Sequence, residues 1–424
     1  MFSPEILQEV RSRFAHVDSC PFQGKRVFFE NAGGALTLNS VVQTSAMMAA
    51  IPDNQGRDNP AAHELVRIID KAKADTRIFL GVTGGQVFVG ESGTELLFRL
   101  IRSAITGAMP GGIVLGSTLE HPSTRSACDQ WARYTGRPHV LVEHNAQTGS
   151  VTVEDYLPHI TAQTRVATIV HTSPGTGMGV DVGAIAAAIR QISPDCIIVV
   201  DGIQHAAHGG LDLDSYQIDG YVISPYKVFS RHGYGLAWVS DRLSALPHER
   251  LNGTPDSQWE LGTRDTGAYA TFSDVVDYFE WLGSKFTASG DRRARIEAAG
   301  VAISAQEAYL SQCMLHGVNG LPGLADMSEV TVIGGIDNPM REGLVAMTID
   351  GIASADIVSA LREQGIRTHV RKNDHYSSNF LTPLGLESCV RVSMCHYNSG
   401  EEVAAFLKAV QSIIAASAAA SESA

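Results

Sequence analysis

Between about residue 60 and residue 250, helix-like blocks alternate with short apolar runs. In the helix-like blocks, apolar residues recur three and four positions apart, as in HELVRIIDKAKADTRIFLG, TELLFRLIRSAI and VGAIAAAIRQI. The runs GQVFVG, GGIVLGS, HVLVEH, RVATIVHTS and CIIVVDG are rich in β-branched residues and are mostly apolar on both sides. Strands buried on both faces have this pattern, so the sequence predicts an α/β domain with a mainly parallel sheet covered by helices.

The last third of the chain has a different pattern, which predicts a smaller α+β domain. A helical block spans roughly 272–315, and strand-like runs then alternate with helices around a polar loop at 369–381, HVRKNDHYSSNFL. The final AASAAASESA is of low complexity. We therefore expect an N-terminal segment packing with the small domain (1–30), a large domain (31–275), a small C-terminal domain (276–412) and a flexible tail (413–424).

Composition narrows the function classes. The net charge of −13 argues against a general nucleic-acid or anionic-membrane surface, because both attract basic proteins. A run of about 18 apolar residues, as a membrane span needs, is not seen. The N-terminus lacks the layout of a signal peptide, and the six cysteines have neither CxxC nor metal-ligand spacing. We expect a cytoplasmic protein with reduced cysteines, no membrane or nucleic-acid partner and no metal.

Unusual polar residues follow the predicted strands, where ligands gather in a parallel sheet. Lys227 stands just after the apolar Tyr221-Val222-Ile223, although an ammonium group is costly to bury without a partner or a reaction. Asp201 follows four aliphatic residues, and Gly93-Thr94 opens a predicted helix. A lysine that forms an imine, a carboxylate at a ring nitrogen and a helix N-terminus match the aldehyde, the pyridinium nitrogen and the phosphate of pyridoxal 5′-phosphate. The sequence therefore predicts a pyridoxal-phosphate enzyme.

A set of motifs, in order along the chain, resembles a known family. The motifs EHPS, VVDGIQHAAHG, SPYKVFSRHGYG, WELGTRDTG and VRVSMCHYNSGEEV are similar to those of class V aminotransferases, and within these to the cysteine desulfurase-like group. The resemblance runs from about residue 27 to 412. It implies the fold type I architecture of pyridoxal-phosphate-dependent transferases, with a large domain and a smaller C-terminal domain.

The resemblance also implies roles for single residues. Lys227 would form the Schiff base and Asp201 would pair with the pyridinium nitrogen. Arg391 would bind the substrate carboxylate, and Asn31, in ENAGG, falls in the segment that lines the substrate pocket in relatives. The other cofactor contacts would be His121 stacked on the ring, Gln204 at the ring hydroxyl, and Gly93, Thr94, Ser224 and Tyr226 at the phosphate, with Tyr226 replacing the usual histidine.

Two further expectations concern the edges of the site. Thr266, in GTRDTG, matches a position that reaches the neighbouring subunit's phosphate in relatives, which implies a homodimer with the active site at its interface. In the polar loop, His369, Arg371, His375 and Tyr376 include a candidate substrate ligand or general acid, of which we single out His375; a solvated loop is the simpler interpretation.

The chain departs from the desulfurase pattern in two places. Desulfurases have a nucleophilic cysteine on the mobile loop before the Arg391 strand, whereas the loop at 369–381 contains none. Cys389 and Cys395 flank Arg391 on the predicted strand itself, which would hold them rigidly, although sulfur transfer needs a thiol that can travel. The other departure is Pro174, where relatives often have asparagine.

We therefore expect a C–S β-lyase that expels a β-leaving group from a cysteine derivative through a Lys227 aldimine. Lys227, once released, is the natural general base. A cysteine desulfurase, or an aminotransferase or epimerase of the same family, remains the alternative. A cofactor-binding sensor with little turnover is a further one, which the presence of Lys227, Asp201 and Arg391 together disfavours.

Overall fold

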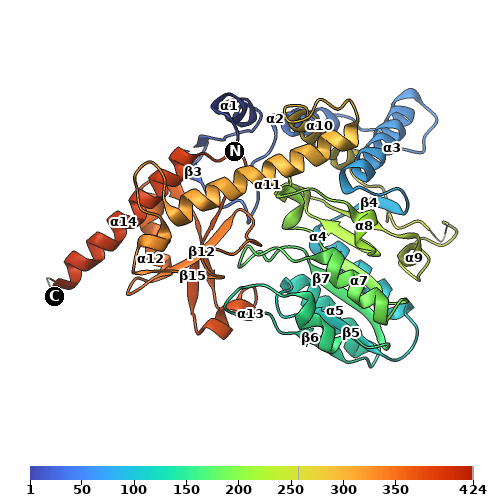
Figure 1. The fold of residues 1–424 in the computed structure, drawn as a ribbon. Coiled ribbons are helices and arrows are strands. Elements are labelled where there is room, and N and C mark those ends of the chain that lie inside the picture. Colours follow the sequence, from blue (N-terminus) through green and yellow to red (C-terminus); the bar gives the residue numbers. More distant parts are fainter. Residues whose placement is uncertain (256, 423–424) are drawn as a thin grey trace.

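The computed structural model describes residues 1–255 and 257–422, and a seven-stranded sheet forms the centre of its larger domain (Figure 1). Five neighbouring strands run parallel, whereas one strand, β10, pairs antiparallel with both of its neighbours. The prediction of a mainly parallel sheet is confirmed; β10 is the strand that the sequence analysis did not single out. In spatial order the strands are β4 (Gln86–Gly90), β10 (Gly235–Val239), β9 (Gly220–Ile223), β8 (Ile197–Asp201), β7 (Thr164–Val170), β5 (Ile113–Ser117) and β6 (His139–Val142).

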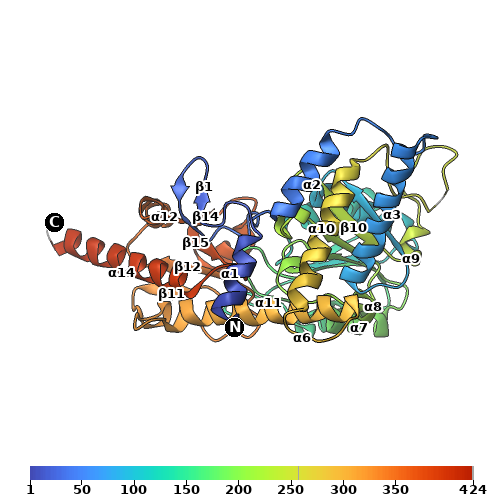
Figure 2. The same ribbon diagram turned by 90° about the horizontal axis from the view of Figure 1, so that it is seen from above.

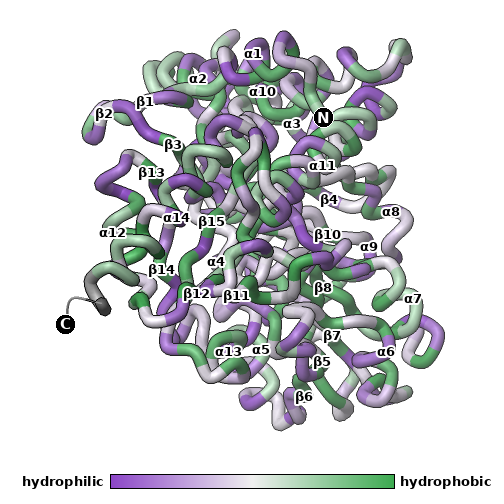
Figure 3. The backbone as a smooth tube through the Cα atoms, turned by 60° about the vertical axis from the view of Figure 1, so that its left-hand side comes forward, coloured by the Kyte–Doolittle hydropathy of each residue, from purple (hydrophilic) through white to green (hydrophobic). Residues whose placement is uncertain are grey.

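Both faces of this sheet are buried, which explains why its strands are apolar throughout. On β8, Val199 packs in one cluster with helices α4 and α5, and Ile198 and Val200 pack in the other with α7 and α10. The central strands are coloured as hydrophobic in Figure 3. The helices of this domain are α2 (Asn39–Ala49), α3 (Pro60–Leu80), α4 (Gly93–Gly107), α5 (Pro122–Tyr134), α6 (Val153–Tyr156), α7 (Val182–Ile192), α8 (Leu213–Tyr216), α9 (Asp241–Ser244) and α10 (Thr266–Gly283).

The smaller domain is built on a four-stranded antiparallel sheet in the order β11-β12-β15-β14. Helices α12 and α14 pack against this sheet and form a separate apolar core with it. Its elements are β11 (Val330–Val332), β12 (Leu344–Ile349), α12 (Ser354–Glu363), β13 (Ile366–Arg367), β14 (His369–Lys372), α13 (Ser378–Leu381), β15 (Ser388–Ser393) and α14 (Gly400–Glu422).

Helix α11 (Arg292–His316) runs along both domains, as Figures 1 and 2 show. Its first half contributes Ile296 and Ile303 to the core of the large domain. Its second half contributes Leu310 and Met314 to the core of the small domain. One continuous helix therefore holds the two domains at a defined distance from each other.

The N-terminal segment contacts both domains. Helix α1 (Pro4–Ser12) begins after Ser3, whose hydroxyl accepts a hydrogen bond from the backbone N–H of Ile6. A hairpin of β1 (Ser19–Cys20) and β2 (Gly24–Lys25) follows, and β3 (Val27–Phe28) pairs with β13 of the small domain. Phe14 packs on Phe229 and Tyr278 of the large domain.

Four local expectations differ from the structure. The helical block at 272–315 is divided into α10 and α11 by a turn, and the polar loop at 369–381 contains β14 and α13. The expected flexible tail, 413–424, is helical through Glu422, because α14 continues into the alanine-rich end, and residues 423–424 lie outside the described residues. Cys395 does not lie on the strand with Arg391, because β15 ends at Ser393.

Helix α14 is long and apolar enough over Gly400–Ala419 to cross a membrane by length and composition. Val403, Phe406, Leu407 and Val410 on this helix are fully buried in the small-domain core. The part of the helix that carries these residues is therefore a core helix of a folded domain.

The contact between α10 and α11 can be tested with Gly283→Ala. A Cβ added at Gly283 would lie 1.7 Å from the carbonyl oxygen of Arg295. One helix must therefore shift, and we expect the free energy of unfolding to fall by roughly 1–3 kcal/mol. Gly290→Ala in the same connection is the matched control, because a Cβ there meets no atom within 4 Å. Urea denaturation followed by circular dichroism measures both; equal stability would contradict the close contact.

Candidate active site

Lys227 lies in a single 3-10 turn, Pro225–Lys227, directly after β9. Its Nζ donates a hydrogen bond to Oε1 of Gln204 at 3.2 Å. Desolvation lowers the pKa of Lys227 to about 7, and the positive charge of Arg391 acts in the same direction, whereas Asp201 opposes it. A large fraction of this amine is therefore neutral near pH 7, which a nucleophile and a general base both require.

Asp201 ends β8, next to β9, and its side chain is 4 % exposed. Its Oδ1 accepts a hydrogen bond from the backbone N–H of Ile203 at 3.1 Å, and its Oδ2 accepts one from the hydroxyl of Thr124 at 3.4 Å. Burial raises the pKa of Asp201 to about 6 against these hydrogen bonds and Lys227. The buried Glu120 has a pKa well above its ordinary value because of burial and of Asp201. Of the two buried carboxyl groups, Asp201 and Glu120, Asp201 is thus the one that is charged near pH 7.

The N-terminus of α4 approaches the turn after β9 very closely. A Cβ at Gly93 would lie 2.4 Å from Oγ of Ser224 and 2.6 Å from Cδ1 of Ile203. On the other side, a Cβ at Gly235 would meet the backbone of Ser92 and Gly93 at 2.4–2.6 Å. The first backbone N–H groups of a helix have no partner within it, so this glycine-lined end has donors that can bind an anion. The adjacent Thr94 is exposed.

Aromatic rings border the turn that holds Lys227. His121 caps the N-terminus of α5, and its Nδ1 lies 2.7 Å from the hydroxyl of Ser123. Desolvation and then Lys227 lower the pKa of His121 to about 3, so its ring is neutral. The ring of Tyr226 stacks on that of His232 with centroids 4.3 Å apart.

Arg391 projects from β15 of the small domain toward this edge of the large sheet. Its Nη1 donates to the carbonyl oxygen of Pro174 at 3.0 Å, so the proline at this position supplies a backbone acceptor. Desolvation lowers the pKa of Arg391 to about 10, and the nearby Arg371 lowers it further while Glu30 opposes the shift. The guanidinium stays charged at pH 7, and it lies beside the backbone of Gly33.

Three of the expected site residues have their nearest partners outside this group. Asn31 is buried, with its amide nitrogen on the backbone of Ser393 at 2.8 Å and its oxygen bonded to the hydroxyl of Tyr397, so its amide joins the two domains. Thr266 is buried at the start of α10, beside Met48. His375 is exposed and contacts only Tyr376 in the ring contacts of the described residues.

Comparison with known proteins decides the family. The sequence profile of class-V aminotransferases matches residues 27–406. The chain belongs to the class-V aminotransferase family. Membership makes it a pyridoxal-phosphate-dependent enzyme of the cysteine desulfurase-like kind. The expected family and enzyme class are thereby confirmed.

Curated relatives span almost the whole chain. The aminotransferase-like protein FGM3 of Gibberella zeae is 24 % identical over 96 % of this chain and 98 % of its own length. The cysteine desulfurase-like protein ustD of Aspergillus flavus is 24 % identical over 96 % of this chain and 90 % of its own length.

Solved structures establish the fold type I architecture. A cysteine desulfurase from Thermococcus onnurineus superposes with a TM-score of 0.82 at 19 % identity, over 98 % of this chain and 99 % of that one. The cysteine desulfurase CsdA of Escherichia coli gives a TM-score of 0.77 at 21 % identity, with the same coverage. At these identities the likeness concerns the fold.

The two thiols next to Arg391 in the sequence, Cys389 and Cys395, are poorly placed for transfer chemistry. The segment 369–381, which contains β14 and α13, has no cysteine. Cys389 is fully buried on β15, and burial raises the pKa of its thiol to about 12. Cys395 is 1 % exposed, and its pKa lies well above the ordinary value for the same reason. Neither side chain is a thiolate near pH 7.

Sequence reasoning missed a buried acid–base pair next to the site. Nδ1 of His208 lies 2.7 Å from Oε2 of Glu307 on α11, and both side chains are buried. A signal for it exists in the sequence: Glu307 falls four residues after Ile303 and three before Leu310, on the apolar stripe of the class-V enzyme's bridging helix. A charged residue in such a position indicates a buried partner.

The lowered pKa of Lys227 is directly measurable. In the cofactor-free class-V enzyme, trace acetylation with acetic anhydride should label Lys227 with a midpoint near pH 7, because only the neutral amine reacts. The exposed Lys408 serves as the internal reference in the same digest. Mass spectrometry of the two peptides from pH 5 to 11 gives both curves. A Lys227 midpoint at the ordinary lysine pKa of about 10.4 would contradict the desolvated amine.

Proposed function

We propose that this enzyme is a C–S β-lyase that acts on a cysteine derivative. The observation that carries the proposal is the segment 369–381, which contains no cysteine and is folded as β14 and α13. A desulfurase needs a thiol that reaches the substrate sulfur, and Cys389 and Cys395 are buried. Elimination of the sulfur substituent needs no protein nucleophile.

The residues around Lys227 fit pyridoxal phosphate. The glycine-lined N-terminus of α4 with Ser224 suits the phosphate, because a Cβ at Gly93 would fill the space beside Oγ of Ser224. Asp201, charged near pH 7, suits a protonated ring nitrogen, and the neutral His121 ring suits stacking. When bound, this cofactor supplies an aldehyde for the amine of the substrate and a ring that accepts electrons from its α-carbon. Gln204, Thr94 and Tyr226 complete the contacts that we assign to it.

Lys227 is the group that moves the α-proton. Its pKa of about 7 gives a neutral amine that accepts a proton near physiological pH. Asp201 has the opposite charge and favours the protonated amine afterwards. The bond between Cβ and sulfur then breaks with its electrons on sulfur. With one water, the products are the protonated sulfur leaving group, pyruvate and ammonia.

Arg391 orients the substrate through its carboxylate. A planar, permanently charged guanidinium binds a carboxylate through two parallel hydrogen bonds. The Nη1 bond to Pro174 fixes the plane of the group, and Arg371 adds a second positive charge nearby. His375 and Asn31 remain candidates for the walls of the substrate pocket, His375 from the segment 369–381 and Asn31 from the N-terminal side.

We also propose a homodimer located in the cytoplasm. Met47 and Ile51, on and just after α2, are 58 % and 37 % exposed, although both are large apolar residues. Ile51 borders the same surface hollow as Thr266. A second chain that covers this face would remove apolar area from water and bring its own residues to Thr266. All six cysteines are free thiols, in keeping with a reducing compartment.

A product assay separates this function from its alternatives. With L-cysteine, cystine and a cysteine S-oxide, the cofactor-loaded enzyme should release pyruvate without alanine, because elimination leaves no sulfur-free amino acid. Lactate dehydrogenase coupling measures pyruvate, and amino-acid analysis measures alanine. Cys389→Ser should leave the pyruvate rate within about twofold, since a buried thiol has no part in elimination, whereas Lys227→Ala should abolish it.

The other outcomes identify the rivals. Alanine together with a protein persulfide would mean that a cysteine reaches the substrate, as in a desulfurase. Loss of the α-proton to solvent with neither pyruvate nor alanine would favour an aminotransferase or an epimerase.

Gly93→Ala tests the proposed phosphate seat separately from catalysis. The added methyl group would displace Ser224, so we expect the dissociation constant for pyridoxal phosphate to rise at least about tenfold, equivalent to ~1.4 kcal/mol. Gly84→Ala is the control, since its Cβ meets its nearest neighbour at 3.8 Å. Absorbance titration of the cofactor-free variants gives the constants, and circular dichroism verifies their fold. Unchanged affinity in Gly93→Ala would place the phosphate elsewhere.

A further inference from the structure

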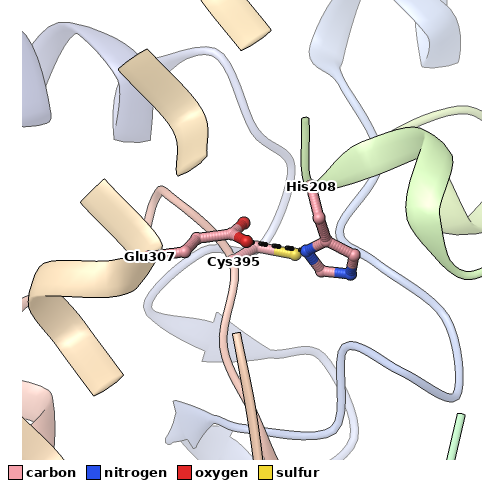
Figure 4. A group of neighbouring side chains, drawn as sticks. All are labelled: His208, Glu307 and Cys395. Atoms are coloured by element: carbon pink, nitrogen blue, oxygen red, sulfur yellow. Dashed lines mark hydrogen bonds and ion pairs between the residues drawn. The ribbon is translucent and has the colours of Figure 1, made fainter. Parts of the chain in front are cut away.

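A buried carboxylate–imidazole pair connects the two domains behind Lys227. Figure 4 shows His208, from the large domain, facing Glu307 of the bridging helix α11, with Cys395 beside them. Nδ1 of His208 lies 2.7 Å from Oε2 of Glu307, and the two side chains are 5 % and 2 % exposed.

The side-chain amide of Gln204 connects the His208–Glu307 pair to Lys227. Nε2 of His208 lies 3.3 Å from Nε2 of Gln204, and Oε1 of the same amide accepts the hydrogen bond from Nζ of Lys227 at 3.2 Å. Gln204 and His208 are both 6 % exposed. A continuous path of hydrogen bonds therefore runs from the buried Glu307 to Lys227.

The proton on His208 determines which way the amide can face. In the neutral imidazole with its proton on Nδ1, Glu307 accepts a hydrogen bond from Nδ1–H. The free Nε2 then accepts an N–H from Gln204, and the amide oxygen faces Lys227. With a proton on Nε2, two donors would oppose each other and the amide would turn. Its NH2 group would then face Lys227, where it cannot accept a hydrogen bond from an ammonium group.

We propose that Glu307 and His208 are positioning residues of the candidate active site, which set the orientation of the Gln204 amide and thereby the acceptor to which Lys227 donates its hydrogen bond. The inference rests on the proposed function for the role of Lys227 but not for its own test, which uses cofactor-free protein. The charged and titratable groups that face His208 are Glu307, Cys395, Glu342, Lys227 and His396.

The experiment compares two glutamates, Glu307 and Glu342, that each pair with a histidine. In Glu307→Gln the proton of His208 is no longer directed to Nδ1, so the midpoint of Lys227 acetylation should fall by about one pH unit. Glu342→Gln is the matched control: Glu342 pairs with His205 at 2.9 Å and has no hydrogen bond to Gln204 among the described residues. Its Lys227 midpoint should remain that of the wild type. Trace acetylation and mass spectrometry measure all three proteins.

A double-mutant cycle distinguishes an effect transmitted through the Gln204 amide from the direct electrostatic effect of removing the Glu307 charge. In a Gln204→Met background, Glu307→Gln should cause no further shift, because the amide that transmits the effect is gone. A shift of the same size in that background would overturn the proposal and leave only electrostatics. So would an unchanged Lys227 midpoint in the folded Glu307→Gln protein.

Two additional measurements keep the test decisive. If Glu307→Gln does not fold, the variant His208→Gln tests the same relation, because an amide at position 208 offers both a donor and an acceptor to Gln204. The midpoint of Lys227 acetylation should again fall. An unchanged midpoint would overturn the proposal. Elemental analysis of the wild type is the other measurement. A stoichiometric metal ion that disappears in Glu307→Gln and in Cys395→Ser would show that His208 is a ligand, and would also overturn it.

Discussion

The desolvated amine of Lys227 is the constraint on which the rest of the site depends. A charged ammonium group cannot be withdrawn from water without compensation, so the surrounding groups decide its protonation. Arg391 on one side disfavours the charge and Asp201 on the other favours it, and the balance lies near pH 7. This balance needs both groups within Coulomb range of one amine. It therefore requires the ends of two neighbouring parallel strands and a strand of another domain to meet at one point.

The two-domain architecture meets this requirement. Strands β8 and β9 bring Asp201 and Lys227 to the same edge of the large sheet because they are parallel neighbours. Arg391 comes from β15, and the domains are held in place by α11 and by the amide of Asn31. Asn31 thus contributes to the site through the geometry it imposes. The same holds for Pro174, whose carbonyl oxygen receives Arg391 across the domain boundary.

Those parts of the fold and the site that depend on local pattern were predictable from the sequence. Apolar runs followed by polar residues identified β8 and β9 and the residues after them, because strand burial and strand ends leave a direct trace in the chain. The His208–Glu307 pair and the Asn31 network were not predictable, since their partners are 99 and more than 360 residues apart. The strand β14 was missed because its residues are polar, and Cys395 was misplaced because a strand end depends on pairing partners.

Electrostatics on two length scales defines what the site admits. The chain has a net charge of −13, so at long range it repels polyanions. Within the site, however, the guanidinium groups of Arg371 and Arg391 lie near each other, and charges inside a low-dielectric cleft act over short distances with little screening. A small zwitterion has one carboxylate for Arg391 and one amine near Lys227. Because its net charge is zero, the long-range field of the negatively charged chain hardly changes its energy as it approaches. The amino-acid substrate proposed above would therefore meet little long-range repulsion from the net negative chain, and Arg391 would attract its carboxylate at short range.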